Sequence, residues 1–329
     1  MLDWIDHEAG PNWLYALVLL VAQSAWVLAM LWWNGGLRDG FDPSKIFIVA
    51  VAPYLLWARF YLDGVAARAM DAFRPALAVS DEEFLRLRYE LTTLPAPLTR
   101  IATIAAVVGY ILNAALLPDR ILAQFGPSLG VSAVLLAPVA IFTLAVVVIS
   151  TAQAVRQLWM VDLIHGLAEH VNLFRVKPFY AFSGLASRTG MSFLLLAYFV
   201  AAMRPDIVRD TPVLQVLIVA MLPTAVACFV LPLYGMHLRL VAEKDRLLAE
   251  ANSRFETLLA RLHARVDGEI LTDADKLSHQ ISSVAAEREA ISRLSTWPWD
   301  VATVTGFLTT LVLPVLLWLV QRLLGRLGM

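Results

Sequence analysis

Long apolar segments recur along the chain and are separated by shorter polar connections. Residues 121–155 contain no charged side chain, and neither do residues 211–235. Uncharged apolar runs longer than about 18 residues are typical of membrane-spanning helices, because about 20 helical residues cross a bilayer. The pattern predicts an all-α, polytopic membrane protein with about seven transmembrane segments, at 12–33, 44–64, 98–117, 131–153, 183–203, 211–234 and 301–320.

The second predicted segment is the least apolar, because it contains Pro53, Arg59 and Asp63. If it lies along the membrane surface instead, six segments remain and the amino terminus changes sides. Asp63 follows Arg59 by four residues, a spacing that brings two side chains together on one helix face. Arg59 and Arg188 lie near predicted membrane boundaries, so we expect their long side chains to reach the headgroups. The alternative is a functional role, since a charge inside a membrane is costly.

Lysine and arginine are unevenly distributed among the connections. The connections at 64–97, 154–182 and 236–300 hold 4, 3 and 9 of them, whereas the other three hold 1, 1 and 2. Cytoplasmic loops are enriched in basic residues, so the three richer connections are expected inside the cell. With seven segments, the amino terminus is then cytoplasmic and the carboxyl terminus is external. We expect the location to be a prokaryotic plasma membrane.

The polar connections also contain helix signals. Ser80-Asp81-Glu82-Glu83 predicts a helix start, because the side chains of Ser80 and Glu83 can bond free backbone amides of the first turn. That helix is expected to reach about Leu91, before the prolines at 95 and 97. The fourth segment is predicted to continue beyond the membrane as an amphipathic stem. Its apolar residues keep a spacing of three to four: Val155, Leu158, Val161, Ile164, Leu167, Val171 and Phe174.

The connection at 236–296 carries two apolar series with a seven-residue spacing. Heptad spacing indicates that one helix packs against another, and the turn dipeptide Asp267-Gly268 lies between the two series. We therefore predict an antiparallel cytoplasmic hairpin, which either closes on itself or meets the hairpins of neighbouring subunits. The packing positions are Val241, Leu248, Phe255 and Leu262 in the first arm, and Ile270, Leu277, Val284 and Ile291 in the second.

One face of the last membrane segment carries small or polar residues, whereas its other faces are mostly Leu, Val and Phe. Such a face contacts something other than lipid. One interpretation is close helix packing, since Gly306 and Thr310 form a pair of small residues four positions apart. The other interpretation is the lining of a water-filled pore on an oligomer axis. The stripe consists of Thr303, Gly306, Thr310, Pro314, Leu317 and Gln321.

The overall composition narrows the function classes. Of 329 residues, 59% are hydrophobic and 16% charged, against about 45–50% and about 25% in soluble domains. The net charge of −1 provides no basic surface for nucleic acid. The single cysteine, Cys228, excludes an internal disulfide, and His165 and His170 are five residues apart, a poor spacing for metal ligands on one helix. We expect no metal, no cofactor and no enzymatic activity, because the phosphate-binding, hydrolase and metalloprotease motifs are absent.

The end of the last segment resembles a motif of a known family. The hydrophobic run 316–320 is followed by Gln321, as in the seven-transmembrane ion channel superfamily that includes insect gustatory and odorant receptors. The last helix of that family ends in Thr-Tyr, five hydrophobic residues and Gln-Phe, whereas Pro314, Val315 and Arg322 stand here in place of Thr, Tyr and Phe. The organisation is similar over most of the chain. The resemblance implies a cytoplasmic anchor domain, a last helix divided into two parts, and four subunits around a cation pore.

The leading functional hypothesis is a homo-oligomeric ion channel, a tetramer if the resemblance holds. The chain then divides into a membrane part at 1–235, the cytoplasmic hairpin at 236–296 and the last membrane helix with its tail at 297–329. The alternative is a non-conducting, membrane-anchored sensor or scaffold whose hairpin binds a partner. A transporter ranks third, because no convincing repeat relates the two halves. The expected partners are the lipid bilayer and further copies of the chain, and no ligand is identified.

Overall fold

The computed structural model describes residues 12–33, 47–116, 129–168, 172–203, 212–267 and 274–326. Within these ranges the backbone is mostly helical, and an isolated bridge between Leu77 and Ala168 is the sole β pairing. Five of the described helical stretches are long and apolar enough to cross a bilayer. The prediction of an all-α, polytopic membrane protein is therefore confirmed.

Seven long helices contain the predicted membrane segments, as far as these are described. Two shorter α-helices, α4 (Asp81–Thr92) and α11 (Ala274–Ser292), and two 3-10 turns, η2 (Arg74–Ala76) and η3 (Lys177–Tyr180), complete the described elements. Of the long helices, α3 is not among the five apolar stretches, and the described apolar part of α12 is shorter than a full span. The long helices are α2 (Asn12–Trp33), α3 (Phe47–Phe73), α5 (Ala96–Leu116), α7 (Leu129–Gly166), α8 (Ala181–Met203), α10 (Pro212–Asp267) and α12 (Val301–Arg326).

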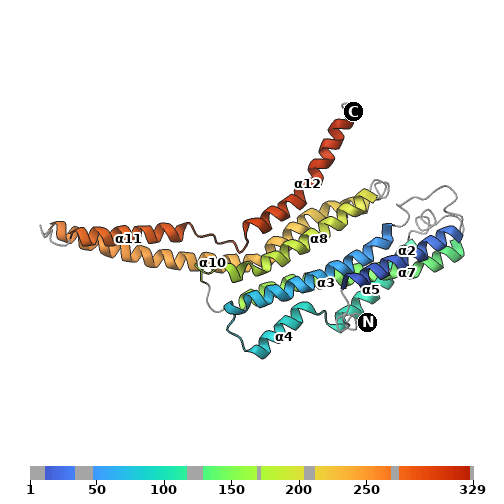
Figure 1. Cartoon of the computed structure of the whole chain (residues 1–329), viewed down its shortest axis with the longest axis horizontal. Coiled ribbons are helices and arrows are strands. Elements are labelled where there is room, and N and C mark those ends of the chain that lie inside the picture. Colours follow the sequence, from blue (N-terminus) through green and yellow to red (C-terminus); the bar gives the residue numbers. More distant parts are fainter. Residues whose placement is uncertain are drawn as a thin grey trace.

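Helix α3 occupies the middle of the bundle. It packs against both α7 and α8, while α2 contacts α3, and α5 packs against α7 (Figure 1). Helix α10 packs against α8 and α7, and α12 packs against α8. The largest apolar core lies where α3, α7, α8 and α10 meet, and its fully buried side chains include Met70, Phe73, Ile164, Phe182 and Leu240.

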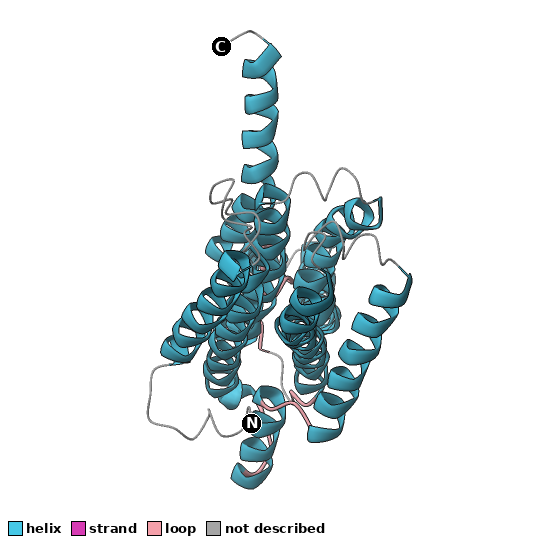
Figure 2. Ribbon diagram, turned by 90° about the vertical axis from the view of Figure 1, so that its right-hand side faces the viewer, coloured by secondary structure: helices cyan, strands magenta, loops and turns pink. Residues whose placement is uncertain are grey.

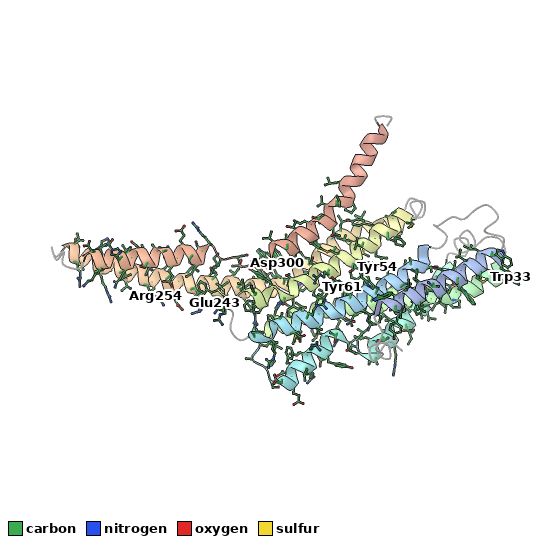
Figure 3. All side chains as sticks on the ribbon, in the orientation of Figure 1. Trp33, Tyr54, Tyr61, Glu243, Arg254 and Asp300 are labelled. Carbon is green, nitrogen blue, oxygen red and sulfur yellow. The ribbon has the colours of Figure 1, made fainter. Side chains whose placement is uncertain are left out.

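Helix α10 is the longest element, with 56 residues. At about 1.5 Å per residue it extends about 84 Å. The sixth predicted membrane segment and the first hairpin arm both lie within it, so they form one continuous helix. Helix α11 returns antiparallel beside the second half of α10 (Figure 1). Figure 3 places Glu243 and Arg254 on this hairpin, whereas Trp33 lies at the opposite end of the molecule.

The start of α4 follows the predicted capping arrangement. The backbone N–H of Glu83 donates to Oγ of Ser80 at 3.2 Å, and α4 ends at Thr92. The hydroxyl satisfies one of the amides that have no partner within the helix. The predicted start of this helix is confirmed, and its end differs by one residue.

The amphipathic stem is shorter than predicted. Helix α7 ends at Gly166, so the predicted continuation of the helix to Phe174 is wrong, and Val171 lies outside the described residues. The guanidinium of Arg239 on α10 donates to the carbonyls of His165 at 3.0 Å, Gly166 at 2.8 Å and Ala168 at 3.3 Å. These bonds stabilise the end of α7, because the last carbonyls of a helix have no partner within it.

Replacing Arg239 by leucine is expected to destabilise the chain by about 1–2 kcal/mol, because a partly buried cation at a helix C-terminus contributes about that much. The measurement is the free energy of unfolding in detergent. Arg246→Leu is the matched control on the same helix. Arg246 is exposed and donates to Glu243 at 2.6 Å, a hydrogen bond that lowers the pKa of that carboxyl. The expected loss for the control is below about 1 kcal/mol, and equal losses contradict the role of Arg239.

Candidate functional site

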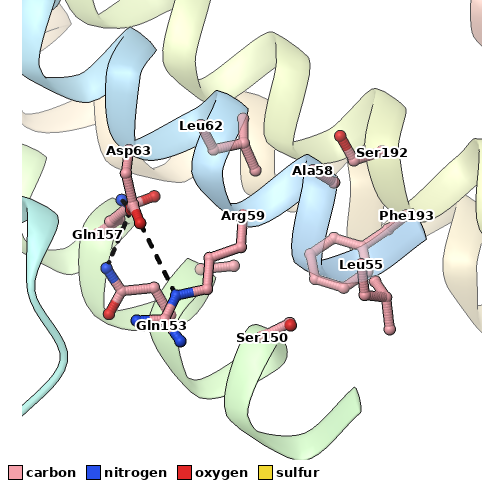
Figure 4. Close-up of a pocket in the computed structure, with 11 residues that line it drawn as sticks. Leu55, Ala58, Arg59, Leu62, Asp63, Ser150, Gln153, Gln157, Ser192 and Phe193 are labelled. Carbon is pink, nitrogen blue, oxygen red and sulfur yellow. Dashed lines mark hydrogen bonds and ion pairs between the residues drawn. The ribbon is translucent and has the colours of Figure 1, made fainter. Parts of the chain in front are cut away.

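A cluster of polar side chains lies inside the bundle where α3 faces α7 (Figure 4). Helix α3 contributes Arg59 and Asp63, and α7 contributes Gln153 and Gln157. Both glutamines donate from Nε2 to Oδ1 of Asp63, at 3.2 Å for Gln153. The Nε of Arg59 lies 3.7 Å from Oδ2 of the same carboxylate. Asp63 is thus the common partner in this group of four residues, which we name the Asp63 cluster.

Arg59 points into the bundle. Its side chain is 9% exposed, because α7 and α8 pack against α3. The expectation that Arg59 reaches the headgroups is therefore wrong, whereas its predicted pairing with Asp63 is confirmed. Arg188 differs, since it is exposed on α8 with its guanidinium carbon 6.0 Å from the ring centre of Tyr61. For Arg188 the headgroup interpretation stays a prediction.

The Asp63 cluster is connected to the end of α4. Nε2 of Gln153 lies 3.3 Å from the carbonyl oxygen of Thr92. Three residues further along α7, Nη1 of Arg156 donates to the carbonyl of Thr93 at 2.6 Å and to that of Glu90. Helix α7 therefore holds the turn between α4 and α5 beside α3.

The sequence pattern indicated the α3 half of this cluster and missed the α7 half. Ser150, Gln153 and Gln157 are separated by three and four residues, so they lie on one face of α7. A polar face on an otherwise apolar segment was the signal that could have indicated a partner for Asp63. The apolar positions of the predicted stem do not reveal this polar face, because they lie at other positions of the helix.

The predicted stripe on α12 lies beside the helix contact with α8. Thr303, Gly306, Thr310 and Pro314 are half-buried, and the side chains of Leu317 and Gln321 lie outside the described residues. A Cβ on Gly306 would lie 3.5 Å from Cε of Met191 on α8, and the hydroxyl of Thr310 donates to the carbonyl of Gly306 at 3.0 Å.

Other residues of α12 form its packing face and its exposed face. Phe307 is buried, and Val304 and Leu311 pack against the main core beside it. Thr305 and Thr309, which the stripe did not include, are exposed. The described part of α12 therefore has two rows of threonines, one beside α8 and one facing away from the bundle.

The predicted packing positions of the hairpin that the structure describes are buried or half-buried. Leu277 and Ile291 are buried, and Ile270 lies outside the described residues. Ala251 is also buried, although the heptad series did not include it. Two side-chain contacts join α10 to α11: Nη1 of Arg254 is 3.5 Å from Oε1 of Glu287, and the guanidinium of Arg288 lies over the ring of Phe255. The half-buried positions are Val241, Leu248, Phe255, Leu262 and Val284.

Five stacked aromatic rings connect the hairpin to α12. His237 of α10 stacks on Trp297 with ring centres 3.9 Å apart, and Trp297 stacks on Trp299 at 4.3 Å. Trp299 then stacks on Phe229 of α10 at 5.1 Å, and Phe229 on Phe307 of α12 at 4.7 Å. We name this group the aromatic stack. It fixes the start of α12 to α10.

Backbone contacts reinforce this attachment. Nζ of Lys244 donates to the carbonyl of Ser292, the last residue of α11, at 2.6 Å and to that of Leu294, just beyond α11, at 2.8 Å. Nδ1 of His237 lies 3.0 Å from the carbonyl oxygen of Thr296. Asp300 caps α12, since its Oδ1 accepts from the backbone N–H of Thr303 at 2.6 Å. The segment between α11 and α12 is therefore held along its length by α10.

Among the described residues, no group of three histidine, cysteine, aspartate or glutamate side chains is arranged to hold a metal ion. His165 is buried between the rings of Phe73 and Phe182, and His170 lies outside the described residues. Comparisons of the chain with protein-family models, with curated proteins and with solved structures each find no match. The helices show an integral membrane protein, and its activity has to be argued from the arrangement of its own residues.

Proposed function

We propose that this chain is the subunit of a homo-oligomeric ion channel whose last helix, α12, lines the conduction path. The course of α12 supports this proposal. Its first turns pack against α8 and α10 through Phe307, whereas its second half leaves the bundle and extends away from the other described helices (Figures 1 and 2). A helix that diverges from its own bundle has a surface available for further copies of the chain.

The residues of α12 agree with a role at an oligomer axis. Thr303, Gly306 and Thr310 form a small and polar row, and polar side chains on a membrane helix can line a water-filled path. Pro314 lies inside the helix and removes one backbone hydrogen bond there. A pore helix can bend at such a position, because one backbone hydrogen bond is missing there.

The hairpin is the proposed assembly and control element. It is cytoplasmic if the distribution of basic residues sets the orientation, and the aromatic stack attaches its base directly to the start of α12. A movement that separates this linker from α10 would therefore also move the first turn of α12. If the family resemblance holds, four copies surround the path.

Reconstitution of the purified chain into planar bilayers tests the proposal. We expect cation conductance and a detergent particle containing several copies of the chain. A monomeric particle that conducts none of a broad panel of ions contradicts it.

A cysteine scan tests which face of α12 lines the path. The single native cysteine, Cys228, is replaced by serine first. We expect a charged, thiol-reactive reagent to block conductance strongly in Thr310→Cys and weakly in Leu308→Cys, because Leu308 is an exposed apolar residue that lipid can cover. The readout is the fraction of current lost. Strong block at Thr305 and Thr309 instead would place the path on the opposite face of α12, and no block at any position would exclude α12.

A second candidate function is a membrane-anchored scaffold that conducts nothing. It is favoured by a groove of about 620 Å³ between α10 and α11, lined by Arg254, Arg261 and His279, whose volume is in the range of binding sites. A pull-down with the full-length chain in detergent discriminates between the two functions. A stable complex with a soluble protein, lost in Arg254→Ala with Arg261→Ala, together with no self-association, supports the scaffold.

A further inference from the structure

Several buried polar atoms in the Asp63 cluster, and one beside it, have no hydrogen-bond partner among the described residues. They are Nε and Nη1 of Arg59, Oγ of Ser150 and Oε1 of Gln153. Arg59 has a side chain that is 9% exposed, and Ser150 and Gln153 are 8% and 2% exposed. These three residues line one cavity of about 20 Å³ between α3, α7 and α8 (Figure 4).

These atoms need an occupant, because a buried polar group without a partner pays its full desolvation cost. Their chemistry defines the occupant. Arg59 can only donate, so the occupant must accept a hydrogen bond, whereas Oε1 of Gln153 can only accept, so the occupant must also donate. The Gln153 amide cannot be turned round, because its Nε2 already donates to Asp63.

The charge balance and the size of the cavity further restrict which molecule it can hold. Arg59 and Asp63 already compensate each other, so an anion would leave an unbalanced negative charge in the bundle, and a cation would be repelled by Arg59. A cavity needs about 10–15 Å³ to hold one water molecule, so about 20 Å³ accommodates one such molecule and excludes organic ligands.

We propose that this cavity binds one ordered water molecule, which accepts a hydrogen bond from Arg59 and donates to Gln153 and Ser150. The water completes the hydrogen bonding of a buried arginine and joins α3 to α7 beside the Asp63 cluster. Leu55, Leu62 and Phe193 add apolar lining to the same cavity. This site is independent of whether the chain conducts ions.

Ser150→Val tests the water, because a filled and a dry cavity predict opposite signs. Valine replaces the hydroxyl by a methyl group and adds a second one, so it occupies the cavity. If water is bound, its expulsion leaves the guanidinium N–H of Arg59 and Oε1 of Gln153 without the partner that the water supplied. The apparent melting temperature of the full chain in detergent then falls by about 2–4 °C. If the cavity is dry, the added methyl groups improve packing and the melting temperature rises, which overturns the proposal.

Two further variants separate the water from ordinary effects of the substitution. Ser282→Val makes the same change at an exposed helical position whose hydroxyl only bonds its own helix, so it reports the cost of valine in a helix. Ser150→Ala removes the hydroxyl but leaves room for the water, so we expect a smaller fall than in Ser150→Val. An equal fall in Ser282→Val and Ser150→Val overturns the proposal.

X-ray footprinting provides a direct readout, because radicals generated from a bound water oxidise the side chains around it. We expect oxidation of Leu55, Leu62 or Phe193 in the unmodified chain and in Ser150→Ala, and its loss in Ser150→Val. Absence of oxidation at all three residues in the unmodified chain means a dry cavity and rejects the water. This readout applies even if Ser150→Val does not fold.

Discussion

Replacing Asp63 by leucine is expected to destabilise the chain by about 3–5 kcal/mol, the usual cost of removing one partner of a buried ion pair. The variant leaves the guanidinium of Arg59 inside the bundle without its negative partner. Gln153 and Gln157 also lose the carboxylate oxygen to which both donate. The measurement is the free energy of unfolding of the purified chain in detergent, from a denaturant titration.

The same helix provides a matched control for this result. Asp71 also pairs with an arginine, Arg88, at 3.1 Å, but its side chain is 53% exposed. Asp71→Leu is therefore expected to cost less than about 1 kcal/mol. Removing both charges, in Arg59→Leu with Asp63→Leu, should recover part of the loss, because no uncompensated charge remains. Equal losses of unfolding free energy in Asp63→Leu and Asp71→Leu would show that burial of the ion pair does not determine its contribution to stability.

Gly190→Ala is expected to cost about 3 kcal/mol, the upper end of the usual range for overpacking a core. Gly190 lies where α8, α10 and α12 meet. A Cβ there would lie 2.8 Å from the backbone oxygen of Ala225 on α10 and 3.0 Å from the ring of Phe307 on α12. Because a backbone atom cannot turn aside as a side chain can, the helices have to separate. The free energy of unfolding reports the cost, and a lower conductance is expected alongside it if α12 lines the path.

Gly184→Ala is the control on the same helix. A Cβ on Gly184 meets only the end of the Arg188 side chain, at 3.4 Å, which is free to move. Alanine favours a helix over glycine by about 1 kcal/mol, so this variant is expected to be at least as stable as the unmodified chain. If Gly190→Ala unfolds at the same denaturant concentration as Gly184→Ala, the close helix contact at Gly190 does not exclude a Cβ, and the prediction is wrong.

Local patterns were sufficient to predict the helices. Uncharged runs such as 211–235 can satisfy their backbone groups in lipid only as helices, and Ser80 with Glu83 marks a helix start because both residues act within one turn. The ion pair of Arg59 and Asp63 was also predictable, because a spacing of four residues on a helix fixes the contact.

Contacts between distant segments could not be predicted in the same way. The end of α7 depends on Arg239, 73 residues after Gly166, which binds the last carbonyls of the helix. Arg59 was expected near the headgroups because the sequence does not tell which helices pack around α3. Trp297 and Trp299 form their stack with Phe229 of α10, and no periodicity within the linker specifies that partner.

The aromatic stack also gives the molecule an intrinsic optical signal. The indoles of Trp297 and Trp299 are 4.3 Å apart and nearly parallel, at 9°, so their electronic transitions couple and contribute to the circular dichroism of the chain. Separation of the linker from α10 would remove the rings of His237 and Phe229 that flank this pair, and we expect the contribution to change. Spectra of the unlabelled protein can therefore report, in solution and in vesicles, when the junction between hairpin and last helix opens.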